Sequence, residues 1–99
     1  MKLEFLPEAA AEFYAAADDY ESREKGLGIR FRNEVRTVCR LIVQQPTPWR
    51  EVPGGYRRVN CPVFPYYLSY FIRGDLILVA AMAHGHRDPS YWKDGLAKK

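Results

Sequence analysis

The feature that most constrains the fold is an unbroken apolar run near the end of the sequence, Leu76 to Ala83. Alternate residues of a β-strand point to opposite faces of a sheet, so the strand predicted over Leu76 to His84 is apolar on both faces. Such a strand belongs inside a sheet that is covered by helices on one face and by side chains or a partner on the other. Arg73-Gly74-Asp75 is a hairpin turn signal, which makes Phe64 to Ile72 its antiparallel neighbour.

Two segments in the first half of the sequence carry apolar residues at helical spacing. The first runs from Glu8 to Glu24 and follows Pro7, a residue favoured at the first position of a helix. In the second segment the apolar residues recur at intervals of four, four, three and four: Leu27, Phe31, Val35, Val38 and Ile42. Glycines at 26 and 28 predict a short turn between the two, and therefore a helical hairpin.

The remaining segments complete the predicted fold. Lys2 to Leu6 and Tyr56 to Cys61 alternate as strands do, and Pro46 to Gly55 has the composition of a loop. Asp88-Pro89 offers a cap and a first residue for a short C-terminal helical turn. We therefore expect one α+β domain over residues 1–99, in the order β-α-α-β-β-β. Its helical hairpin packs on one face of a mainly antiparallel four-stranded sheet.

Charge is distributed unevenly along the chain. Residues 1–24 hold seven acids and two bases, a net of −5, whereas residues 25–99 hold 13 bases and five acids, a net of +8. The basic part is the candidate working surface, and a potential of that sign attracts phosphates and acidic polypeptides alike. Arg32, Arg36 and Arg40 form a row at i, i+4 spacing away from the apolar face of the second helix. For a helix taken alone, such a row is more often a solvated face, and a binding surface is the alternative.

Several classes of function are poorly supported by the sequence. Cys39 and Cys61 have neither metal-type nor redox-type spacing, and small buried apolar side chains explain both. No segment approaches the roughly 18 apolar residues of a membrane span, and Glu4 stands where a signal peptide carries positive charge. We expect a cytoplasmic protein with no bound metal, no cofactor and no membrane contact.

The densest cluster of titratable and aromatic groups is His84-Gly85-His86-Arg87-Asp88-Pro89-Ser90-Tyr91-Trp92. A histidine beside an arginine can transfer a proton while the guanidinium stabilises a phosphorane-like charge, as metal-free RNA cleavage requires. A structural alternative is equally open. In that case His84 is a satisfied core histidine, Arg87 pairs with Asp88, and Trp92 closes the core.

The predicted sheet offers further candidate residues. Arg57 and Arg58 are adjacent on one strand, so they point to opposite faces and at most one joins the open face of the sheet. Tyr66, Tyr67 and Tyr70 could stack on nucleic-acid bases, but an aromatic strand also fills a core.

Three motifs resemble a known family. They are Tyr56-Arg57-Arg58-Val59, Phe64-Pro65-Tyr66-x-x-x-Tyr70 and Val79-x-x-x-Ala83-His84-Gly85-His86-Arg87-Asp88-Pro89-x-x-Trp92. With the element order, they resemble the RelE/ParE superfamily of type II toxin-antitoxin toxins, and the likeness covers nearly the whole chain. The resemblance implies a compact sheet with a helical hairpin, in agreement with the order derived above.

The superfamily contains two activities. RelE-like members cleave mRNA on the ribosome through basic side chains of the sheet and a C-terminal tyrosine, whereas ParE-like members lack that set and inhibit DNA gyrase. By resemblance, the RelE-type positions fall at Arg57, Val59, Tyr67, His86, and Trp92 or Tyr91. Among the first three only Arg57 is cationic, and one preorganised donor is worth about 3 kcal/mol in such a transition state. The resemblance therefore favours a ParE-like toxin.

A ParE-like toxin is expected to inhibit DNA gyrase, to arrest growth, to serve plasmid maintenance and to have no enzymatic activity of its own. Its expected partner is a cognate antitoxin that folds on binding and lays an apolar helix or strand over the helical hairpin and the sheet edge. The residues expected to contact the target or the antitoxin are Arg57, Arg58, His84, His86, Arg87, Trp92, Arg32, Arg36 and Arg40.

Two alternatives remain. The first is a RelE-like, ribosome-dependent and metal-free mRNA endoribonuclease, whose catalytic residues would be His86, Arg87, Arg57 and Tyr91. The second is a basic module that binds an acidic partner and catalyses nothing.

Overall fold

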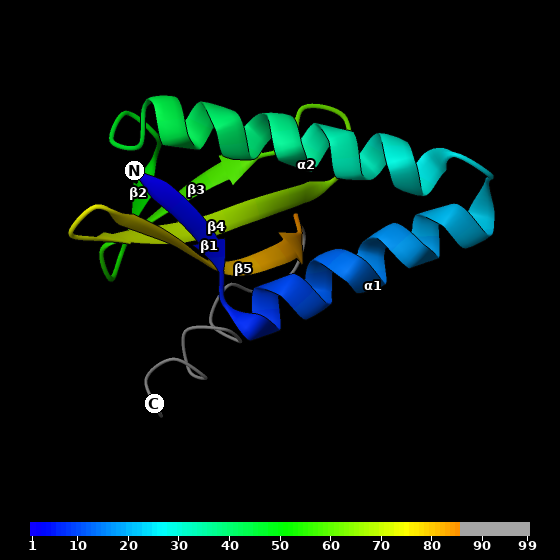
Figure 1. Ribbon diagram of the computed structural model, residues 1–99, viewed down its shortest axis with the longest axis horizontal. Coiled ribbons are helices and arrows are strands. Elements are labelled where there is room, and N and C mark those ends of the chain that lie inside the picture. Colours follow the sequence, from blue (N-terminus) through cyan, green and yellow to red (C-terminus); the bar gives the residue numbers. More distant parts are fainter. Residues whose placement is uncertain (86–99) are drawn as a thin grey trace.

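A computed structural model of the protein describes residues 1–85, which form a helical hairpin packed on one face of a five-stranded sheet (Figure 1). In chain order the elements are β1 (Lys2–Phe5), α1 (Pro7–Arg23), α2 (Leu27–Gln44), β2 (Glu51–Val52), β3 (Tyr56–Asn60), β4 (Tyr66–Arg73) and β5 (Leu76–His84). The predicted α+β class and helical hairpin are confirmed. The predicted C-terminal helical turn lies outside the described residues.

The hairpin is closed by a carboxylate at the end of α1. Glu21 accepts hydrogen bonds from the backbone N–H groups of Gly26 at 2.9 Å and Gly28 at 3.0 Å, which satisfies donors at the start of α2. Gly26 has a φ of 87°, a conformation that favours glycine. A Cβ on Gly28 would lie 2.6 Å from the carbonyl oxygen of Ala17, so glycine permits the two helices to approach. Neither helix is long and apolar enough to cross a membrane.

The sheet has the strand order β1-β5-β4-β3-β2, with β1 parallel to β5 and every other pair antiparallel. The expectation of four strands was therefore short by one. The additional strand, β2, pairs Glu51 with Arg57 and Val52 with Tyr56. Two residues are too few to show alternation, and they stand within the proline- and glycine-rich segment that the sequence predicted as a loop.

The core lies between the hairpin and the sheet. Ile77 and Val79 of β5 pack with Leu68 and Tyr70 of β4 against apolar residues of both helices. On the other face of the sheet, Ala81 belongs to a smaller buried cluster. Because β5 is buried on both faces, the prediction made from its apolar run is confirmed.

Candidate functional site

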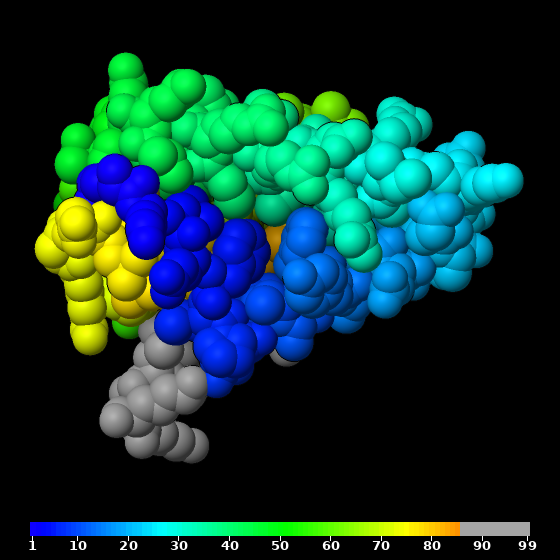
Figure 2. Space-filling model, viewed as in Figure 1, coloured from blue at the N-terminus to red at the C-terminus, as the bar shows by residue number. Residues whose placement is uncertain are grey.

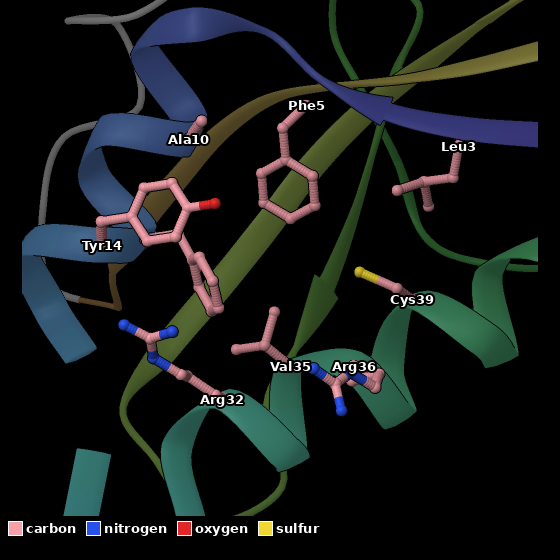
Figure 3. Close-up of a pocket in the computed structure, with 9 residues that line it drawn as sticks. Leu3, Phe5, Ala10, Tyr14, Arg32, Val35, Arg36 and Cys39 are labelled. Atoms are coloured by element: carbon pink, nitrogen blue, oxygen red, sulfur yellow. The ribbon is translucent and has the colours of Figure 1, made fainter. Parts of the chain in front are cut away.

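A groove opens where the outer strand β1 meets the helical hairpin (Figures 2 and 3). It has a volume of about 440 Å³, and three elements contribute its lining: Leu3 and Phe5 from β1, Ala10, Phe13 and Tyr14 from α1, and Arg32, Val35, Arg36 and Cys39 from α2. Leu3 and Phe5 are alternate residues of the strand, so both side chains point to the same side, toward the helices. We call this feature the edge groove.

The edge groove has an apolar floor and a cationic rim. Burial raises the pKa of the Cys39 thiol to about 11, so at neutral pH it is uncharged and adds to the apolar lining beside Val35. At the rim, the guanidinium carbon of Arg32 lies 5.7 Å from the centre of the exposed Tyr14 ring (Figure 3). Arg36 adds a second positive charge one helical turn further along. The chemistry suits an apolar ligand that also carries negative charge.

A second hollow continues the edge groove along α2. It is lined by Arg36, Cys39, Arg40, Val43 and Gln44, and thus shares Arg36 and Cys39 with the first. The predicted row of arginines therefore borders one continuous apolar surface. The structure thus places this row beside a groove, and its role as a binding surface stays a prediction.

Arg57 and Arg58 lie on opposite sides of the sheet, as predicted. Arg57 lies on the helix side, where it donates a 2.9 Å hydrogen bond to the carbonyl oxygen of Trp49 and lies 3.7 Å from Glu51. Arg58 lies on the other side, with its guanidinium carbon 3.9 Å from the centre of the Tyr67 ring. The structure therefore does not bring these two arginines into one site.

His84 is exposed at the end of β5, and its ring centre lies 5.6 Å from that of Tyr66. Both residues line a small hollow together with Glu12 and Asp19 of α1. The interpretation of His84 as a core histidine was therefore wrong, because β5 reaches the surface at this residue. The other predicted members of the cluster lie outside the described residues: His86, Arg87, Tyr91 and Trp92.

The three tyrosines of β4 serve mainly in packing. Tyr67 and Tyr70 are buried, and the half-buried Tyr66 ring packs edge-on against Tyr20 and Phe31. Burial raises the pKa of the Tyr70 hydroxyl to about 12, and this hydroxyl donates a 2.6 Å hydrogen bond to the carbonyl oxygen of Pro46. The sequence left stacking on nucleic-acid bases and core packing open for these rings, and in the structure they pack in the protein.

Comparison with known proteins identifies the family. The sequence model described as "ParE toxin of type II toxin-antitoxin system, parDE" matches residues 3–89. The chain belongs to the ParE toxin family. It is also similar to the solved structure "Chromosomal ParDE TA system from P. aeruginosa", with a TM-score of 0.62 and 21% sequence identity over 85% of this chain and 95% of that chain. No curated protein matches the sequence.

The three sheet positions that the resemblance assigns to RelE-type chemistry do not form a cluster in this toxin. Val59 is buried among apolar residues, on the same side of the sheet as Arg57. Tyr67 lies on the other side, beneath Arg58. The described part of the sheet therefore has no set of converging cations at these positions.

Sequence reasoning missed most of the edge groove. Leu3 and Phe5 were recognised as strand residues, but their place at an outer edge depends on the pairing of β1 with β5, 74 residues apart in the sequence at Lys2 and Leu76. Tyr14 could have been recognised, because an aromatic residue on the polar side of a predicted helix is a candidate for binding. In the structure its side chain is 54% exposed.

Proposed function

We propose that this ParE-type toxin arrests growth by inhibiting DNA gyrase, and that a cognate antitoxin encoded beside it neutralises the toxin. The observation that carries the proposal is the family match over residues 3–89. A protein that acts by binding to a large enzyme needs an exposed surface of suitable charge and no catalytic group of its own.

The geometry of the sheet supports gyrase inhibition over mRNA cleavage. Metal-free phosphoryl transfer needs several preorganised cations around one phosphate. Of the assigned sheet positions, Val59 and Tyr67 are both buried, and neither is a lysine or an arginine. Arg57 is directed to the helix side and bound to the carbonyl oxygen of Trp49. A ribonuclease would therefore have to depend on residues such as His86 and Arg87.

Two observations support an antitoxin partner. The structural relative is described as a ParDE toxin-antitoxin system. In this chain the edge groove combines an apolar floor with Arg32 and Arg36, and an antitoxin segment with apolar and acidic residues fits that chemistry.

A paired activity assay tests the target. Purified toxin should inhibit DNA supercoiling by gyrase and leave ribosome-bound mRNA intact in a translating extract. Site-specific mRNA cuts with supercoiling untouched would reverse the assignment in favour of the ribonuclease. A toxin that affects neither reaction, and arrests no growth in cells, would instead be a basic binding module.

Two variants at the C-terminal cluster sharpen this test. If the toxin inhibits gyrase, Arg87→Ala should weaken growth arrest and His86→Ala should change it less. If the toxin cleaves mRNA, His86→Ala removes a proton-transfer group worth about 100-fold or more in rate and should abolish growth arrest. Thermal melts of the same variants show whether either change acts through stability.

A further inference from the structure

We propose that Val63, at the tip of the loop between β3 and β4, is an apolar contact through which the toxin binds gyrase. The Val63 side chain enters an apolar pocket on the surface of the enzyme. This inference rests on the proposed inhibition of gyrase. It specifies a residue and a surface for that contact, both separate from the edge groove.

Val63 is the most exposed large apolar side chain in the described part of the chain. Its exposed fraction is 75%, compared with 61% for Ile29 and 54% for Tyr14. The next residue, Phe64, is buried in the core, so the loop fixes one apolar side chain inside the protein and presents the other to solvent. Single exposed apolar residues are common on protein surfaces, so exposure alone does not indicate binding. What distinguishes Val63 is the backbone that carries it.

Every backbone N–H group between residues 61 and 66 has a hydrogen-bond acceptor. The N–H groups of Val63 and Phe64 donate to the carboxylate of Glu34 on α2, and the other two donate to carbonyl oxygens of the same segment. Positions 62 and 65 are prolines, which have no N–H group and a fixed φ. The loop therefore holds Val63 in one backbone conformation before any partner binds.

A side chain held in this way is suited to binding. Association costs free energy when loops and side chains have to be ordered in the interface. The backbone around Val63 is already ordered, and a β-branched side chain has few χ1 rotamers to lose. Most of the free energy gained by burying Val63 in a partner would therefore contribute to affinity.

The loop and the edge groove lie on opposite sides of α2 (Figure 1). Arg36 lines the groove, whereas Glu34 binds the loop. Residues two apart in an α-helix are turned by about 200° from each other. An antitoxin segment bound in the edge groove therefore leaves Val63 exposed, and Val63 belongs to a surface that remains for a different partner.

The loop is also joined to the end of β5. The backbone N–H of Gly85 donates a 2.8 Å hydrogen bond to the carbonyl oxygen of Pro65. In the sequence Gly85 directly precedes His86 and Arg87, and gyrase inhibition is expected to depend on Arg87. The apolar tip is thus bonded to the point of the chain at which the expected target contact begins.

A second copy of this chain is a poorer partner than gyrase. A valine tip needs a concave apolar site, and on this chain the edge groove offers one. Insertion of Val63 into the groove of another copy is a head-to-tail contact, which repeats from copy to copy as a ring or a filament. It also blocks the groove assigned to the antitoxin. A pocket on a separate enzyme meets neither objection.

Inhibition of supercoiling by two matched variants tests the contact. The probe is purified gyrase with relaxed plasmid DNA, and the measured quantity is the concentration of full-length toxin that gives half inhibition. Val63→Thr keeps the shape and the β-branching of the side chain but places a hydroxyl in the apolar pocket. It should raise the half-inhibiting concentration about tenfold or more.

Ile29→Thr is the matched control, because it makes the same kind of change at another exposed residue. This variant should inhibit gyrase as strongly as the parent. Val63→Thr should also bind the protein encoded beside the toxin gene as tightly as the parent does, because Val63 does not line the edge groove. Unchanged binding of that partner shows in addition that the variant is folded.

The outcomes separate this inference from the proposed function. If the parent inhibits gyrase and Val63→Thr inhibits it equally well, the inference is overturned and the proposed function stands. An equal loss in Val63→Thr and Ile29→Thr also overturns the inference, because it indicates a general effect of surface apolarity. Oligomers of the parent that Val63→Thr disperses indicate a second copy as the partner and overturn it as well. Absence of inhibition by the parent overturns the proposed function together with the inference.

Discussion

The carboxylate of Glu34 on α2 accepts a 3.0 Å hydrogen bond from the backbone N–H of Phe64, thirty residues further along the chain. The same oxygen also accepts a bond from the N–H of Val63 at 3.3 Å. Phe64 is a core residue, with its ring in edge contact with Tyr20 and Phe31. The Glu34 side chain thus connects the middle of α2 to the loop between β3 and β4.

Removing this carboxylate should destabilise the protein. Glu34→Ala leaves the part-buried N–H of Phe64 without its acceptor, and we expect a loss of about 1–3 kcal/mol in the free energy of unfolding. Urea unfolding followed by circular dichroism measures the change. Glu34→Gln keeps an oxygen acceptor at the same position and should lose less. A Gln variant as unstable as the Ala variant would contradict this assignment.

The close approach of the two helices gives a second prediction. Gly28→Ala puts a methyl group 2.6 Å from the carbonyl oxygen of Ala17, so the hairpin must open. Overpacking of this kind costs about 1–3 kcal/mol. Ile29→Ala is a suitable control, because Ile29 is the next residue of α2 and is 61% exposed. Thermal melts should show a large decrease for Gly28→Ala only, and equal melting temperatures for both variants would refute the packing argument.

Most elements of this fold could be predicted from the sequence because they have a local signal. The apolar run at 76–83 and the intervals from Leu27 to Ile42 placed β5 and α2. Arg57 and Arg58 were placed on opposite faces because successive residues of a strand alternate between the faces of a sheet. By contrast, β2 was missed because a two-residue strand is defined only by the hydrogen bonds it makes with β3.

The edge groove could not be predicted, because no single segment contains it. Leu3, Tyr14 and Arg36 come together only through the parallel pairing of β1 with β5 and the packing of the hairpin on the sheet. The sequence indicated a row of arginines on a helix, without indicating the apolar floor next to that row. Such a site depends on the relative positions of three elements, which local periodicity does not determine.

The buried thiols should make the protein sensitive to alkali. Burial, with smaller contributions from Glu34 and Cys39, raises the pKa of Cys61 from 9.0 to about 12. A folded-state pKa above the unfolded value means that the folded state holds the proton more tightly. The stabilisation is therefore complete below about pH 9 and is lost as the pH rises toward 12.

Urea unfolding between about pH 7 and pH 9 measures this effect, because tyrosines, with an ordinary pKa near 10, contribute little in that range. The free energy of unfolding should fall as the pH rises. In Cys61→Ala the fall should be smaller, because the alanine side chain does not titrate. The remaining slope should include the contribution of Cys39, whose pKa is about 11. An identical slope in parent and variant would contradict the assigned cause.

Two buried tyrosines of β4 provide a matched pair for the last prediction. The Tyr70 hydroxyl donates to the carbonyl oxygen of Pro46, whereas the Tyr67 hydroxyl has no hydrogen-bond partner within the described residues. Both side chains are almost completely buried, with exposed fractions of 0% and 1%. Removing either hydroxyl deletes one oxygen atom from a fully buried side chain, so the two variants differ chiefly in the hydrogen bond that is lost.

We expect Tyr70→Phe to lose about 1 kcal/mol, because a hydrogen bond is broken and the carbonyl oxygen of Pro46 loses its donor. Tyr67→Phe should be neutral or more stable by up to about 1 kcal/mol, because it removes a polar group whose burial is not compensated. Chemical unfolding of both variants measures the difference. An equal loss in the two would contradict the prediction. Because gyrase inhibition assigns no chemistry to the Tyr67 hydroxyl, growth arrest by Tyr67→Phe should match that of the parent.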